Sequence, residues 1–133
     1  HIVNVASLAG RYAVPGSSVY SSTKHAVVAF SEALYYEVAS QGVLVTTVNP
    51  SFVRTEGFSA GDMEKLPQAI VLDADQVAEA ILDVVRREKA PELSVPRWMA
   101  SMQSVRILAP PLYRAALKRM SRRGVTTRKL RGE

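Results

Sequence analysis

The run of residues 43–48 constrains the fold more than any other part of the sequence, because every residue in it is apolar or threonine. A strand that is apolar on both faces is typical of a parallel sheet with helices on both sides. A β-branched run precedes it at residues 2–6, and residues 93–95, bounded by Pro91 and Pro96, predict a short third strand.

Helical segments separate the three predicted strands. Residues 18–39 predict a long helix that Gly42 ends, because the apolar residues Ala26, Phe30, Ala33, Leu34 and Val38 recur there at helical spacing. A second helix is predicted to begin after Asp73, an N-cap residue that Gln76 completes as a capping box. Strands that alternate with helices are typical of the α/β fold class.

Composition is that of an ordinary globular domain and argues against several kinds of site. The 133 residues suffice for one domain with a core, and 47% of them are hydrophobic. With no cysteine, and with two histidines at no paired spacing, neither a disulfide nor a metal site is expected. No apolar run reaches the ~18 residues of a membrane-spanning helix and no signal segment is visible. The absence of cysteine suits a reducing cytosol, so we expect a protein of the cytoplasm, either free or peripheral to a membrane.

The formal charge of +5 is unevenly distributed along the chain. Residues 1–92 hold seven Lys/Arg and eleven Asp/Glu, a net charge of −4, whereas residues 93–133 hold ten Lys/Arg and one acidic residue, a net charge of +9. Such an asymmetry indicates that the tail differs in role from the body. We therefore divide the chain into a main part, residues 1–96, and a basic amphipathic C-terminal extension, residues 97–133.

Tyr20 and Lys24 are four residues apart near the start of the first predicted helix, so both side chains lie on one helix face. An ammonium group near a phenol favours the phenolate, which lowers the tyrosine pKa and suits it to proton transfer. Ser7 follows the first predicted strand, at the edge where active-site groups of open α/β sheets gather. Each feature alone is common as a solvated helix face or a polar strand end, and only their combination indicates a site.

Three stretches of the sequence share their order and spacing with a known family. They are Asn4-Val5-Ala6-Ser7 with Ala9-Gly10, Tyr20-Ser21-Ser22-Thr23-Lys24, and Asn49-Pro50-Ser51-Phe52-Val53-Arg54-Thr55. Over roughly residues 1–95 the chain resembles the short-chain dehydrogenase/reductase family, and Ser7 lies 13 residues before Tyr20, as that family usually shows. The resemblance implies a Rossmann-like doubly wound parallel sheet, of which this chain holds the C-terminal half.

The resemblance also implies an oxidoreductase that transfers a hydride between NAD or NADP and an alcohol or carbonyl substrate. Tyr20 is then the general acid and base, Lys24 lowers its pKa and binds the nicotinamide ribose, and Ser7 stabilises the substrate oxygen. The residues that would line the nicotinamide are Pro50, Val53, through its backbone, and Thr55.

Two departures from the family pattern are visible. Ser51 stands where the family has a glycine, and a positive φ at that position would strain a serine. The glycine-rich phosphate-binding turn and the residue that selects NAD or NADP have no counterpart in this sequence. We therefore expect a fragment that does not turn over substrate by itself, with residues 2–6 as an edge strand that lacks one neighbour.

The basic extension allows three interpretations. Between residues 97 and 123 it mixes Trp, Met and Leu with Arg and Lys, and Pro110-Pro111 is expected to separate two helices, the second with a stripe of Leu112, Ala115, Ala116 and Met120. The extension could pack over the substrate pocket, or it could lie on a membrane surface. Binding to nucleic acid is the least favoured interpretation, because no nucleic-acid-binding fold is visible.

Residues 55–66 lie where the family carries its variable substrate loop. Phe58, Met63 and Leu66 are candidates to line an apolar pocket there, and a surface loop with a few packed apolar residues is the equal alternative. The resemblance implies a homo-oligomer, and the apolar loop and tail favour a hydrophobic alcohol or carbonyl substrate. The alternative to an enzyme is a non-catalytic fragment or membrane-associated binding protein that retains the fold.

Overall fold

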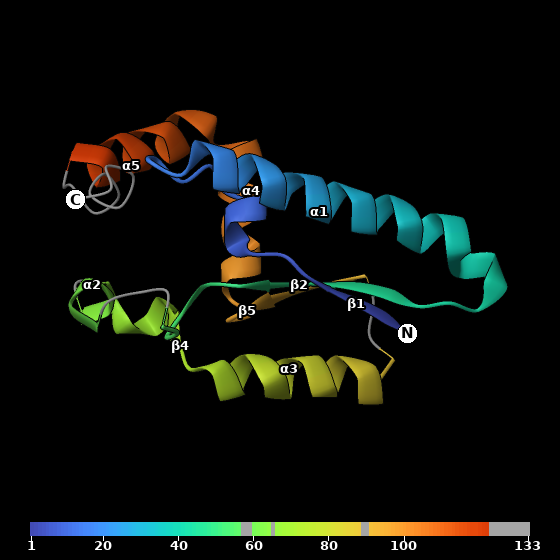
Figure 1. Ribbon diagram of the computed structural model, residues 1–133. Helices are drawn as coiled ribbons and strands as arrows, with labels where there is room; N and C mark the ends of the chain where they lie inside the picture. Colours follow the sequence, from blue (N-terminus) through green and yellow to red (C-terminus); the bar gives the residue numbers. More distant parts are fainter. Residues whose placement is uncertain (57–59, 65, 89–90, 123–133) are drawn as a thin grey trace.

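A computed structural model describes residues 1–56, 60–64, 66–88 and 91–122. Its centre is a parallel sheet in the order β1-β2-β5, formed by β1 (Ile2–Val5), β2 (Val45–Pro50) and β5 (Glu92–Val95). Figure 1 shows α1 (Ser18–Val38) on one side of this sheet and α3 (Ala74–Arg86) on the other. The predicted α/β class and the parallel sheet are therefore confirmed.

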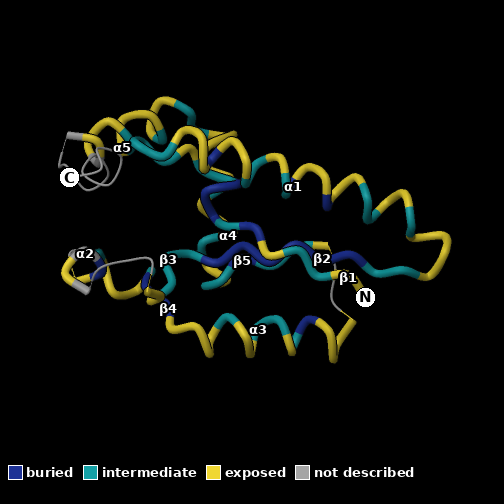
Figure 2. The backbone as a smooth tube through the Cα atoms, in the orientation of Figure 1, coloured by how far each residue is buried: buried dark blue, intermediate teal, exposed yellow. Residues whose placement is uncertain are grey.

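The central strand β2 forms the core of the molecule. All of its residues are buried, and Val45 and Val48 are fully inaccessible to solvent. Figure 2 shows β2 as a buried segment between the partly exposed neighbours. The predicted burial on both faces is confirmed, although the strand begins at Val45 and continues through Pro50. β1 is an edge strand of this sheet, with Ile2 and Val5 exposed.

Capping contacts confirm two predicted helix boundaries. α1 is followed by the 3-10 helix η2 (Ala39–Gln41), which Gly42 terminates with a φ of 72° in the left-handed region that glycine adopts without strain. At the start of α3, the Asp73 N–H donates to Oε1 of Gln76 at 2.8 Å, as the predicted capping box requires.

The face that α1 turns toward the sheet differs from the predicted apolar face. Its buried residues are small and recur at helical spacing, namely Ser21, Val28 and Ser31. Asn4 of β1 donates to Oγ of Ser31 at 2.9 Å, so part of this contact is polar. The apolar residues that predict the helix are largely exposed, and we name as the α1 stripe the exposed residues Val19, Ala26, Phe30 and Ala33.

A second, two-stranded parallel sheet, which the sequence did not predict, pairs β3 (Phe52–Val53) with β4 (Val71–Leu72). The chain between them includes α2 (Ala60–Glu64) and the 3-10 helix η3 (Gln68–Ile70). Met63 of the predicted substrate loop is buried, Leu66 is half-buried, and Phe58 lies outside the described residues. Met63 is therefore a packing residue in this structure.

The C-terminal extension contains α4 (Met99–Leu108) and α5 (Pro110–Arg122). The predicted break at Pro110-Pro111 is confirmed, with Pro110 as the first residue of α5. In the predicted stripe of α5, Leu112, Ala115 and Ala116 are exposed, whereas Tyr113 and Leu117 of the same helix are half-buried. The side chain of Met120 lies outside the described part of the chain.

The 3-10 helix η1 (Leu8–Gly10) packs directly against α1, and Gly10 makes this close approach possible. A Cβ atom at position 10 would lie 2.6 Å from the carbonyl oxygen of Lys24 and 2.9 Å from Cγ2 of Val28. Backbone atoms of a helix cannot move aside as the end of a flexible side chain can. Glycine therefore allows the segment after β1 to contact the turn of α1 that carries Lys24.

The Gly10→Ala substitution is expected to lower the free energy of unfolding by about 1–3 kcal/mol, because the added methyl group overpacks the contact with Lys24. Gly61→Ala is the matched control, since no atom lies within 4 Å of a Cβ there and alanine is the better helix former. Urea unfolding of the full-length protein that contains these residues measures both effects. Equal stability of the two variants would contradict this account.

Candidate active site

Ser7 lies two residues after the end of β1 and caps η1. Its Oγ accepts a hydrogen bond from the Ala9 N–H at 3.1 Å and donates one to the carbonyl oxygen of Pro50 at 3.5 Å. The second bond is long and therefore weak. The Ser7 hydroxyl can turn its proton toward another oxygen at little cost, which is what binding a substrate oxygen requires.

Lys24 links α1 to the carboxyl end of β1. Its Nζ donates to the carbonyl oxygen of Val5 at 3.3 Å, and it lies 5.8 Å from the centroid of the Tyr20 ring. A cation near the face of an aromatic ring is attracted by the electron density of the ring. Tyr20 is 50% exposed, so a ligand from solvent can reach it.

These contacts place the three predicted catalytic residues at one end of the sheet. Ser7 lies two residues after β1, Lys24 binds the last residue of β1, and Tyr20 lies one helical turn before Lys24. Among the described contacts no hydrogen bond joins Ser7 to Tyr20. The edge beyond the carboxyl ends of parallel strands is where open α/β sheets bind their ligands.

The predicted cofactor-binding residues lie at and beyond the carboxyl end of β2. Pro50 is the buried last residue of that strand and offers its carbonyl oxygen to Ser7. Val53 belongs to β3, where it pairs with Leu72, and Thr55 follows β3 with an exposed side chain. Pro50 is thus beside Ser7, whereas Val53 is held by the second sheet.

The strain considered for Ser51 is absent. Glu88 is the sole non-glycine residue with a positive φ in the described part of the chain, so the φ of Ser51 is not positive. The Ser51 N–H donates to the Val95 carbonyl at 2.8 Å and so extends the pairing of β2 with β5. Serine fits this backbone position without a conformational cost.

An ion pair that the sequence did not reveal ties the segment after η1 to the sheet. Arg11 Nε donates to Oε1 of Glu92 at 2.8 Å, and Nη2 of Arg11 binds the other carboxylate oxygen. Oε1 of Glu92 also accepts from Nδ2 of Asn49, a fully buried residue of β2, at 2.6 Å. Arg11 and Glu92 are 81 positions apart, so no local sequence pattern could have indicated their contact.

The helices α4 and α5 contact the chain segment between Ser7 and Tyr20. The Tyr12 hydroxyl donates to the carbonyl oxygen of Met99, the first residue of α4. The Ala13 N–H donates to the Tyr113 hydroxyl of α5 at 3.2 Å. The extension is therefore part of the same folded body as the candidate site, and it helps to fix that loop.

Arg106 of α4 adds a third connection to the same region. Its Nη1 donates to the Arg11 carbonyl oxygen at 2.6 Å and lies 3.2 Å from Nε2 of His25. The other ring nitrogen of His25 lies 2.8 Å from the Ser21 carbonyl oxygen. Because both nitrogens of His25 have partners, this histidine is not placed to activate a nucleophile.

Tyr12 has a perturbed acidity. Burial raises the pKa of its hydroxyl above the usual value of 10.0, and nearby Tyr113 and Glu92 raise it further. Both causes act in the same direction, because burial and a negative neighbour each disfavour the phenolate. The folded state therefore holds Tyr12 in the neutral form that donates to the Met99 carbonyl.

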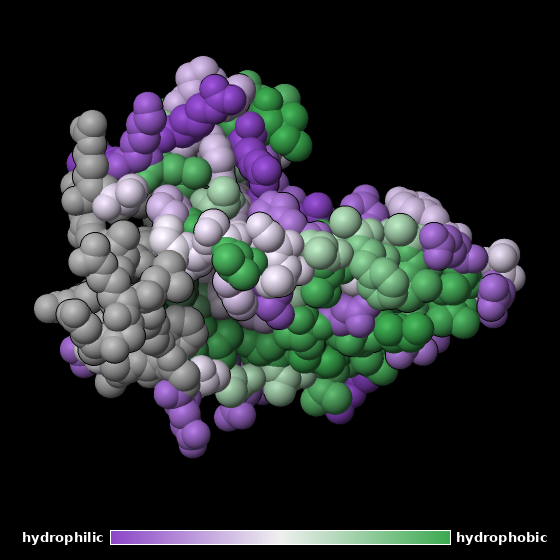
Figure 3. Space-filling view, turned by 45° about the horizontal axis from the view of Figure 1, so that its top comes forward, coloured by the Kyte–Doolittle hydropathy of each residue, from purple (hydrophilic) through white to green (hydrophobic). Residues whose placement is uncertain are grey.

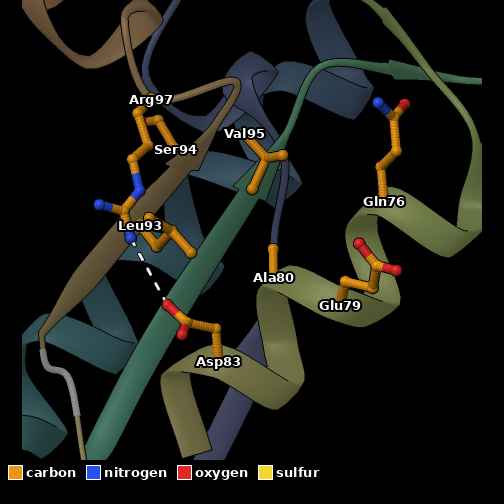
Figure 4. A pocket seen from close by; sticks show the side chains of 8 residues that line it. All are labelled: Gln76, Glu79, Ala80, Asp83, Leu93, Ser94, Val95 and Arg97. Atoms are coloured by element: carbon orange, nitrogen blue, oxygen red, sulfur yellow. Dashed lines mark ion pairs between the residues drawn. The ribbon is translucent and has the colours of Figure 1, made fainter. Parts of the chain in front are cut away.

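A pocket of about 270 Å³ lies between α3 and β5, away from the candidate site. Figure 4 shows that Glu79 and Asp83 of α3 line it together with Arg97, whose Nη2 is 3.6 Å from Oδ2 of Asp83. Ser7, Tyr20 and Lys24 take no part in this pocket. In the described ranges, moreover, no cluster of three or more His, Asp or Glu side chains could hold a metal ion.

Comparison with known proteins finds relatives of this chain. The family model for short chain dehydrogenases matches residues 1–65, which contain Ser7, Tyr20 and Lys24. A Drosophila melanogaster protein named dehydrogenase/reductase SDR family protein 7-like is 33% identical, over 85% of this chain and 37% of that protein. The Mus musculus dehydrogenase/reductase SDR family member 7B is 30% identical, over 85% of this chain and 38% of that protein.

Solved structures show the same arrangement of elements. A short-chain dehydrogenase from Streptomyces avermitilis has a TM-score of 0.60 at 29% identity, over 86% of this chain and 50% of that one. A 4-hydroxyisoleucine dehydrogenase complexed with NADH has a TM-score of 0.56 at 21% identity, over 70% of this chain and 44% of that one. At this identity the likeness concerns the fold alone. This chain spans slightly more than a third of the length of the two relatives from fly and mouse.

The raised pKa of Tyr12 predicts a pH-dependent contribution to stability. Because the folded-state pKa exceeds the unfolded one, the contribution is complete below pH 10.0 and is lost as the pH rises through the folded value. We expect the free energy of unfolding to fall less steeply above that pH in Tyr12→Phe than in the parent. Chemical denaturation of the full-length protein at a series of alkaline pH values tests this, and parallel curves would contradict it.

Proposed function

Because this chain is related to the short-chain dehydrogenase/reductase family, we propose that it supplies the catalytic side chains of an NAD- or NADP-dependent oxidoreductase. The reaction is reversible hydride transfer between the cofactor and an alcohol or carbonyl substrate. In this proposal the chain corresponds to the C-terminal, catalytic part of a Rossmann-like doubly wound domain. The parallel order β1-β2-β5, with helices on both faces, supports that correspondence.

One observation carries the proposal, namely the attachment of Lys24 to the last residue of β1. The bond from Nζ to the Val5 carbonyl fixes the start of α1 against the strand that leads into Ser7. Tyr20, which is half-exposed, is thereby kept at the same end of the sheet as the Ser7 hydroxyl.

In the direction of carbonyl reduction, the Tyr20 hydroxyl gives its proton to the substrate oxygen as the substrate carbon receives a hydride. The Ser7 hydroxyl donates a hydrogen bond to the same oxygen, where negative charge develops, and gives up its long bond to Pro50. The Lys24 ammonium compensates the negative charge left on Tyr20. The oxidation of an alcohol follows the same steps in reverse.

The residues present fit the nicotinamide end of a cofactor. Lys24 carries three N–H donors, and the bond to Val5 uses one, which leaves two for ribose hydroxyls. Pro50 is the last residue of β2, and Val53 and Thr55 come after it; in this proposal the three residues would line the ring. A bound nicotinamide would donate the hydride in reduction and accept it in oxidation. The structural neighbour complexed with NADH is consistent with this class of cofactor.

The proposal includes a homo-oligomer and a hydrophobic substrate. The α1 stripe leaves Phe30 62% exposed and Val19 77% exposed, and contiguous apolar exposure of this kind is typical of a protein interface. For the substrate, the support is the apolar content of residues 55–66 and of the C-terminal extension. The cytoplasm is the location that we propose for the enzyme.

Tyr20→Phe in the full-length protein is expected to lower kcat by about 10²–10⁴-fold, because it removes the proton donor while keeping the ring. Tyr36→Phe is the matched control, since it removes another hydroxyl from the same helix at 67% exposure, and its kcat should stay within about twofold of the parent. Oxidation of NADH and NADPH, followed at 340 nm with a panel of hydrophobic carbonyls, measures both. A Tyr20→Phe variant as active as the parent would contradict the role given to Tyr20, and a full-length parent that oxidises neither cofactor would support the alternative, a binding protein that retains the fold.

A further inference from the structure

The C-terminal extension presents large apolar side chains to solvent. The most exposed lie around the junction of α4 and α5, where Ile107 is 77%, Leu108 82% and Leu112 64% exposed. Trp98, Met102 and Val105 continue this surface along α4. We call these six residues the tail patch. Figure 3 shows hydrophobic and strongly hydrophilic residues side by side on the lobe that α4 and α5 form.

The charged residues of the segment that carries the tail patch are all of one sign, although Arg97 is paired with Asp83 of α3. Residues 97–122 contain six Lys or Arg and no Asp or Glu. Arg114, Lys118 and Arg119 of α5 are exposed. The α1 stripe is different, because α1 carries Lys24 against Glu32 and Glu37. Two exposed apolar surfaces therefore occur in different electrostatic surroundings, which indicates different partners.

The helices that carry the tail patch are attached to the body of the molecule by two hydrogen bonds. Arg106, which stays exposed, binds the Arg11 carbonyl, and the half-buried Tyr113 binds the Ala13 N–H. Their sequence neighbours Ile107 and Leu112 are exposed. The apolar surface is thus presented by docked helices rather than by a loose tail.

We propose that the tail patch is an interfacial binding surface for membranes that contain anionic lipids. Apolar side chains with tryptophan among them, on a segment whose charged residues are all Lys or Arg, match both layers of such an interface, the acyl chains and the headgroups. None of the described helices is long and apolar enough to cross a bilayer, so the contact lies on the surface of the membrane. Arg123, which the sequence adds to this basic set, lies outside the described residues.

Other occupants fit the tail patch less well. A second copy that docks through the same patch would place its cationic helix against this one, and the like charges would repel. A nucleic acid would use the positive charge but would leave Ile107, Leu108 and Leu112 without a role. The proposal does not depend on the oxidoreductase activity, so either idea can fail without the other.

Co-sedimentation of the full-length protein with vesicles tests the proposal. We expect binding to phosphatidylcholine vesicles that contain about 30% phosphatidylserine, little binding to pure phosphatidylcholine, and loss of binding as NaCl rises from about 0.05 to 0.5 M. Leu108→Ser should weaken binding about tenfold, since a leucine side chain no longer enters the interface. The matched control is Leu82→Ser on α3, a helix with acidic residues Asp75, Glu79 and Asp83, and it should bind as the parent does.

A second measurement guards against misfolded variants. Lys118→Glu with Arg119→Glu changes exposed side chains only, and it should abolish binding to the anionic vesicles while the circular dichroism spectrum is retained. Brominated lipids should quench the emission of the parent more than that of Trp98→Phe. Equal vesicle binding by the parent, Leu108→Ser and the charge-reversed variant would overturn the proposal. So would a self-association of the protein that Leu108→Ser removes while vesicle binding is absent.

Discussion

The contact between Gly10 and the Lys24 turn of α1 is the constraint on which the candidate site depends. With no side chain at position 10, the backbone after β1 lies against the backbone of α1, and Lys24 can reach the carbonyl of Val5. The lysine that would serve in catalysis is therefore also the side chain that attaches the helix to the strand. Burial of the central strand supplies the rigid base, because β2 positions both its parallel neighbours and the Pro50 carbonyl beside Ser7.

A second layer of contacts fixes the same region from the other side. The bidentate pair of Arg11 with Glu92 joins the segment after η1 to β5, and Arg11 also lies 4.0 Å from Glu32 of α1. Partly buried ion pairs contribute little net stability but set geometry, because a displaced partner leaves a charge uncompensated. The docked helices α4 and α5 add bonds to residues 11–13, so the basic extension and the candidate site form one structural unit.

Much of the fold follows from local patterns in the sequence. The apolar run at residues 43–48 indicated a buried parallel strand, and Asp73 with Gln76 located the start of α3. The orientation of helices could not be predicted in the same way. Apolar spacing suggested Phe30 as an inward residue of α1, yet close packing on the sheet selects the small residues Ser21 and Ser31. In α5, the spacing of apolar residues did not indicate that Tyr113 makes the contact with the body. For the site, spacing brought Tyr20 and Lys24 together, whereas the contacts of Arg11 and Arg106 depend on tertiary structure alone.

The central claim is that Ser7 and Tyr20 act on one substrate oxygen at the carboxyl end of the sheet. A crystal structure of the full-length protein with a nicotinamide cofactor and a carbonyl inhibitor tests it most directly. The account predicts that the inhibitor oxygen lies about 2.6–3.2 Å from both the Ser7 Oγ and the Tyr20 hydroxyl, with the Lys24 ammonium still at the Val5 carbonyl. An inhibitor bound elsewhere, or with its oxygen near only one of the two hydroxyls, would contradict the account.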